Sequence, residues 1–182
     1  RGGTLVNFAE THDNLRLAAA GKTYAKVRFL VNALLPRNGA FGFANGVEWF
    51  ATEKIDVHEA SALHWCAELN QVDMIGRLNR ILALLPCFHN GSEIHVIDSH
   101  CPDAVMLGRT DHSGTSKVII AVNLNTEHHA QIRWNSYSAP MDAGEMYDLI
   151  SGKKIYLAEM SAGERSLLLA GGEVLCLTSD RN

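Results

Sequence analysis

The sequence predicts a chain of mixed fold class, in which an α/β segment precedes an all-β segment. Residues 4–43 spell strand, loop, helix and strand, which is the order of a right-handed βαβ unit with parallel strands. After residue 90 the helical spacing of apolar residues stops, and short apolar runs separated by turns follow. We therefore predict a boundary near residue 90, with an α/β domain over 1–90 and an antiparallel β-sandwich over 91–182.

Composition narrows the classes of partner. The 182 residues are 47% hydrophobic, enough to bury a core, and the net charge of -4 supplies no basic field for nucleic acid or an acidic membrane surface. No apolar run approaches the ~20 residues that cross a bilayer, and no secretory leader pattern opens the chain. Neither the four cysteines nor the nine histidines show metal-ligand spacing. We expect a cytoplasmic protein with an uncharged ligand and without metal or cofactor.

The α/β segment begins with a strand over residues 4–10, whose weak alternation is typical of a strand covered on both faces. Apolar residues at helical spacing predict a helix over 23–35, which ends before Pro36. A second strand is predicted over 40–43. Because the two strands flank one helix, their carboxyl ends are expected at the same edge of a parallel sheet.

Beyond the second strand, residues 49–70 form an insertion longer than packing requires, and it contains Trp49 and Trp65. A second amphipathic helix is predicted over 74–85, ended by Pro86. The β-segment then carries eight predicted strands, at residues 93–97, 104–109, 117–123, 130–134, 146–149, 154–157, 165–169 and 173–178.

The polar stretch after the first strand holds the first candidate functional residues. His12 and Asp13 end an apolar run, at the position where α/β barrels keep their chemistry, since loops open there while the strand holds the side chains. A polar turn in which Asp13 only caps the next segment remains an alternative. Arg16 is a further candidate, with a simple ion pair to Asp13 or a neighbouring acid as its alternative.

Phe8-Ala9-Glu10-Thr11-His12-Asp13-Asn14-Leu15-Arg16 resembles the seventh-strand motif of the α-amylase family of glycoside hydrolases. Gly46-Val47-Glu48 is similar to the Gly-x-Glu turn after strand eight of that family. Residues 78–88 resemble its last barrel helix, and the runs 118–125, 147–152 and 172–175 resemble the β-domain that follows the barrel. Thr11, where the family commonly has Asn, and Asn14-Leu15, where it has Thr-Pro, depart from the pattern and leave the subfamily open.

The resemblance implies that the chain holds the last two βα units of a (β/α)8 barrel and the terminal β-sandwich. It implies a parent α-glucan hydrolase or glucanotransferase with a retaining mechanism, whose nucleophile and acid/base stand on strands that this chain lacks. Asp13 would then stabilise the transition state, and His12, Arg16 and Glu48 would bind substrate. We expect the segment alone to be inactive, and its unpaired strands to favour self-association or association with the missing barrel portion.

Two other functions remain open. In one, the β-segment is a non-catalytic carbohydrate-binding or structural module, with Trp134, Tyr137 and Tyr156 as a possible platform, although core or cross-strand packing is the more common role of strand aromatics. In the other, residues 16–23 bind phosphate before a helix; Arg16 stands where that motif requires glycine, which argues against it.

Overall fold

The structure is a computed structural model that describes residues 5–37, 39–58, 63–161 and 163–179. Thr4 of the first predicted strand and residues 59–62 of the insertion lie outside the described residues. The chain forms two compact units, residues 1–76 and 77–182, with the division inside helix α2 (Val72–Leu84). The predicted domain boundary at residue 90 stays a prediction. None of the helices in the described ranges is long and apolar enough to cross a membrane.

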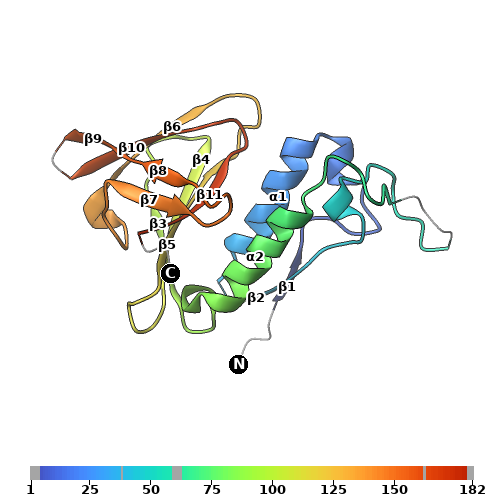
Figure 1. The fold of residues 1–182 in the computed structure, drawn as a ribbon, viewed down its shortest axis with the longest axis horizontal. Coiled ribbons are helices and arrows are strands. Elements are labelled where there is room, and N and C mark those ends of the chain that lie inside the picture. The colour runs from blue at the N-terminus through green and yellow to red at the C-terminus, as the bar shows by residue number, and fades with distance from the viewer. Residues whose placement is uncertain (1–4, 38, 59–62, 162, 180–182) are drawn as a thin grey trace. The chain divides into compact units, whose positions relative to one another are not determined.

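Unit 1 is built on two strands that run in the same direction. β1 (Leu5–Phe8) pairs parallel with β2 (Gly39–Gly42), and α1 (Lys22–Leu34) connects them (Figure 1). Phe29 on α1 packs edge-on against Phe41 and Phe43, at ring-centroid distances of 4.9 and 5.5 Å. The predicted strand–helix–strand order and the parallel pairing are therefore present.

The expectation that the first strand is covered on both faces is wrong for the described residues. Leu5 is 71% exposed and Val6 58%, and the sheet formed by the described residues has only the two strands β1 and β2. Apolar strand residues lose their exposure only when a further strand or helix covers them, and α1, which packs on β1, leaves these side chains open to solvent.

Unit 2 consists of two antiparallel sheets. The six-stranded sheet has the order β3-β4-β5-β11-β7-β8 and the three-stranded sheet the order β6-β10-β9. The bounds are β3 Glu93–Ile97, β4 Ala104–Thr110, β5 Lys117–Asn123, β6 Ala130–Asn135, β7 Glu145–Asp148, β8 Lys154–Tyr156, β9 Ala158–Ser161, β10 Glu164–Leu169 and β11 Val174–Thr178.

Short 3-10 helices occur in both units. They lie at Leu17–Ala19 and Val47–Trp49 in unit 1, and at Pro86–Phe88 and Ser136–Ser138 in unit 2.

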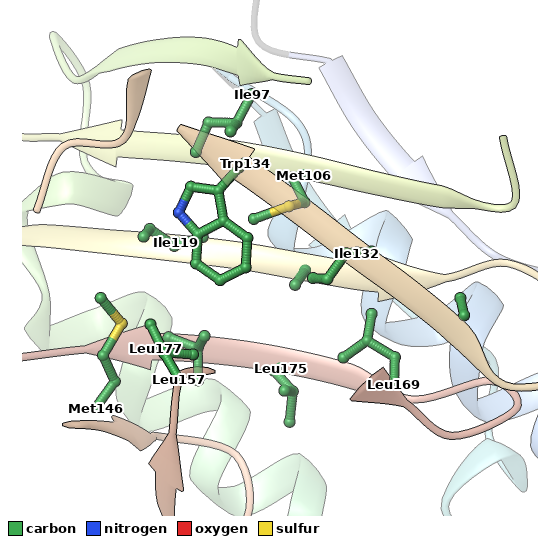
Figure 2. Packing of buried hydrophobic residues seen from close by; sticks show 12 residues of the cluster. Ile97, Met106, Ile119, Ile132, Trp134, Met146, Leu157, Leu169, Leu175 and Leu177 are labelled. Atoms are coloured by element: carbon green, nitrogen blue, oxygen red, sulfur yellow. The ribbon is translucent and has the colours of Figure 1, made fainter. Parts of the chain in front are cut away.

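One apolar core joins the two sheets. β6 alternates strictly, so Ala130, Ile132 and Trp134 are buried while the residues between them are exposed. Figure 2 shows Trp134 and Ile132 on β6 among side chains of the other sheet, including Ile119 and Leu177. This face-to-face packing is that of an antiparallel sandwich, as predicted. The strand β9 was not predicted.

Candidate functional site

The turn after β1 presents His12 and Asp13. Thr11 and Asn14 close this turn, since the Asn14 N–H donates to the Thr11 carbonyl at 3.3 Å and the Thr11 hydroxyl to Asn14 Oδ1 at 3.0 Å. At its tip the side chains of His12 and Asp13 are 56% and 80% exposed, and His12 Nε2 lies 3.4 Å from Asp13 Oδ1. Both polar groups are accessible to a ligand.

A buried ion pair stands beneath this turn. Arg16 Nε lies 2.6 Å from Glu10 Oε1, and the two side chains are 0% and 5% exposed. Glu10 Oε2 also accepts a hydrogen bond from the Leu17 N–H at 2.7 Å, and Arg16 Nη1 donates to the Asn45 carbonyl at 2.9 Å. Arg16 therefore pairs with Glu10, not Asp13, and its contact with Asn45 connects the loop after β1 to the loop after β2.

Glu48 is engaged within its own turn. Its Oε2 accepts a hydrogen bond from the Gly46 N–H at 3.0 Å, and Gly46 has a φ of 92°, in the left-handed region. Gln71 then secures the turn from outside, because its backbone N–H donates to the Glu48 carbonyl at 2.9 Å and its amide Nε2 to the Val47 carbonyl at 2.8 Å. The carboxylate of Glu48 thus stabilises the turn in this structure.

A hollow of about 700 Å³ lies against the two loops. Its wall includes residues of the long insertion, and a neighbouring hollow of about 390 Å³ brings Lys54 and Asp56 beside His12 and Asp13. The larger hollow is lined by Phe8, Glu10, Thr11, His12, Asp13, Ala44, Asn45, Ile55, Asp56, Val57 and Leu63. Most of these side chains are apolar or uncharged, and the exposed pair His12–Asp13 supplies hydrogen-bonding groups at the surface of the hollow.

The four predicted site residues therefore separate into two pairs. His12 and Asp13 line the hollow, whereas Arg16 and Glu48 are not among its lining residues. Sequence reasoning missed Asn45 and Asp56, because a loop residue without a motif gives no signal of which strand end it approaches. The roles assigned to all four residues stay predictions.

The three aromatic residues of the β-segment do not form one platform. Trp134 is 1% exposed and belongs to the core, whereas Tyr137 and Tyr156 are 88% and 69% exposed. In the insertion, the rings of Trp49 and Trp65 lie with their centroids 6.3 Å apart and their planes inclined at 54°. Within the described ranges, no group of three or more His, Cys, Asp or Glu side chains is arranged to hold a metal ion.

Comparison with known proteins gives a fold likeness without a close sequence relative. No protein-family model matches the chain, and no curated protein sequence matches it. A solved maltogenic α-amylase, AmyB from Thermotoga neapolitana, aligns with a TM-score of 0.74 and 17% identity, over 97% of this chain and 41% of that protein. The γ-CGTase from alkalophilic Bacillus clarkii gives 0.70 and 20%, over 97% of this chain and 26% of that protein.

An α-amylase from Lactobacillus plantarum aligns with a TM-score of 0.60 and 14% identity, over 96% of this chain and 38% of that protein. The chain thus has the fold of one part of α-amylase-type enzymes, and its antiparallel sheets match their carboxyl-terminal domain. It spans less than half the length of each of these three solved structures.

Proposed function

We propose that this chain is the carboxyl-terminal part of an α-glucan-active glycosidase or glucanotransferase with a retaining mechanism. Unit 1 would supply the last two βα units of a (β/α)8 barrel. The observation that carries the proposal is the placement of His12 and Asp13 in the turn that follows β1, a strand of a parallel pair, on the wall of a hollow of about 700 Å³. Barrel enzymes place their substrate-binding groups at this end of the strands.

The exposure of β1 supports the same proposal. Leu5, Val6 and Phe8 are 71%, 58% and 48% exposed, which is costly for three apolar side chains on a strand of four residues. Barrel strands that precede β1 would cover them and would pair with its open edge. Without that cover, the same surface favours association between copies of the chain.

In the proposed enzyme, Asp13 and His12 act on the sugar at the scissile bond. The Asp13 carboxylate accepts hydrogen bonds from ring hydroxyls, and His12 contacts the same ring. Contacts of this kind that tighten as the ring flattens lower the barrier to glycosyl transfer more than they strengthen substrate binding. The nucleophile and the acid/base belong to barrel strands outside this chain. Arg16 and Glu48 would have to leave their present partners to touch substrate.

Activity measurements on two forms of the protein test the proposal. We expect the purified 182-residue chain to release no sugar from starch or maltoheptaose, and the longest form encoded by its gene to do so. In the longer form, Asp13→Asn should lower kcat far more than it changes KM. Turnover by the mass-verified 182-residue chain, or an unchanged kcat in the variant, would contradict the proposal.

A glucan-binding β-domain is the second candidate, and the exposed Tyr137 and Tyr156 favour it. Tyrosine rings offer an apolar face to the C–H face of a sugar. Titration of the 182-residue chain with maltoheptaose separates the two candidates. Loss of binding on Tyr156→Ala places the ligand on the β-domain, and loss on Asp13→Asn places it in unit 1.

A further inference from the structure

Glu10 and Arg16 stand at the two ends of the turn that carries His12 and Asp13. The contrast in exposure is sharp: the side chains of Glu10 and Arg16 are 5% and 0% exposed, while those of His12 and Asp13 are 56% and 80% exposed. The ion pair therefore closes the base of a turn whose tip is open to solvent. The Glu10 carboxylate also accepts a hydrogen bond from the Leu17 N–H at 2.7 Å, so one carboxylate contacts both Arg16 and the residue that follows it.

The same pair reaches the second loop. Arg16 Nη1 donates to the Asn45 carbonyl at 2.9 Å, and Arg16 Nη2 lies 3.2 Å from the point where a Cβ on Gly46 would stand. Asn45 lines the hollow together with Asp13. A single buried guanidinium thus connects two loops, each of which contributes a wall of the hollow.

Physical chemistry indicates why charged groups occupy this position. Two buried charges are costly to desolvate, and apolar residues of similar size often stabilise a fold as well or better. What this ion pair adds is orientation, since Glu10 accepts a directional hydrogen bond from the Leu17 N–H and Arg16 donates one to the Asn45 carbonyl. A pair kept at the base of two ligand-facing loops therefore fits a role in positioning those loops.

We infer that Glu10 and Arg16 are positioning residues that set the placement of Asp13 relative to the loop after β2. They act through the turn: Arg16 is not among the lining residues of the hollow, and the carboxylate of Glu10, which does line it, is held by Arg16 and the Leu17 N–H. The inference rests on the proposed function for its catalytic consequence, whereas the joining of the two loops is a property of the 182-residue chain.

Hydrogen exchange on the 182-residue chain tests the joining of the loops. Glu10→Gln removes the charge but keeps the size, and Arg16→Lys keeps the charge but loses the fork that reaches both partners. We expect either change to raise amide exchange in residues 11–17 and 43–47 together, by at least about tenfold, with α1 unchanged. Faster exchange in 11–17 alone, or a uniform rise across unit 1, would overturn the inference.

A control variant removes a carboxylate from another, more exposed Arg–carboxylate pair. Arg165 Nε lies 2.7 Å from Asp142 Oδ1 in unit 2, so Asp142→Asn removes a carboxylate from a guanidinium far along the chain from the two loops. This variant should leave exchange in both loops of unit 1 unchanged. A rise there equal to that of Glu10→Gln would also overturn the inference.

A double-mutant cycle in the longest encoded form tests the catalytic consequence. We expect Glu10→Gln to lower kcat by about 10- to 100-fold with KM nearly unchanged, and to have little further effect once Asp13 is already Asn. Equal effects in both backgrounds would show a merely structural role and overturn the positioning. If Asp13→Asn alone leaves kcat unchanged, the proposed function fails, and the exchange experiment still decides whether the pair joins the loops.

Discussion

Replacing Trp134 with alanine tests whether the two sheets of unit 2 share one core. Trp134 is 1% exposed on β6 and packs in a cluster that includes Ile97, Met106 and Ile119 of the other sheet (Figure 2). Truncating a buried tryptophan costs about 3–5 kcal/mol, through lost burial and the cavity that remains. Since domains are stable by only about 5–15 kcal/mol, this loss removes a large share of the free energy of unfolding. Urea unfolding followed by circular dichroism measures it.

Tyr137 provides the control, because it lies three residues further on and is 88% exposed. Tyr137→Ala should change the free energy of unfolding by no more than about 0.5 kcal/mol. Trp134→Phe keeps a ring in the core and should cost about 1–3 kcal/mol, so it remains measurable if the alanine variant does not fold. Equal losses from the Trp134→Ala and Tyr137→Ala variants would refute the burial of Trp134 between the sheets.

Three further results are expected. Gly46→Ala should destabilise the chain more than Gly91→Ala does. Both glycines have a similar positive φ, 92° and 90°, but a Cβ on Gly46 would stand 2.9 Å from the Ala51 Cβ, whereas nothing lies within 4 Å of a Cβ on Gly91. Similar unfolding midpoints in urea would contradict this. In native protein a thiol reagent should label the exposed Cys66 but not Cys87 or Cys176 until denaturant is added, because burial raises the pKa of both buried thiols. Because the pKa of both thiols is raised, the folded chain keeps two protons that the unfolded chain releases above about pH 8.5. The free energy of unfolding should therefore fall above that pH, by at most about 1.4 kcal/mol per pH unit for each proton. A Cys176→Ala variant should lose less of it between about pH 8.5 and 10, and an unchanged slope would speak against the raised pKa.

The strands of unit 2 show which parts of a fold can be predicted from local sequence. Alternation predicted β6 because its burial pattern repeats every two residues, with Ile132 and Trp134 toward the core. β9 has no such pattern, since all four of its residues are exposed. It exists because β10 offers it a free edge, and the pairing of Glu164 with Ser161 is not visible in either segment alone. Strands held by an edge rather than by burial escape prediction.

The candidate site shows the same limit at the level of side chains. The apolar run predicted a strand ahead of His12 and Asp13, and β1 is present there, although it ends at Phe8 and not at residue 10. The partner of Arg16 could not be derived from spacing, because Glu10 and Asp13 both lie within reach across a turn. Geometry decides for Glu10, since its carboxylate is buried beside the guanidinium, while Asp13 points into solvent.

The proposed function, in which the ligand is an uncharged sugar and not a phosphate, agrees with the chemistry of the hollow. Asp13 is an exposed carboxylate, which accepts hydrogen bonds when ionised and repels a second anion. The buried Arg16 is already committed to Glu10 and Asn45, so its charge is not displayed to a ligand. Apolar side chains such as Ile55 and Val57 also line the wall, beside the solvent-exposed carboxylate of Asp13. A sugar ring offers both matching surfaces, hydroxyl donors at its rim and C–H groups on its faces, whereas a nucleotide phosphate offers neither.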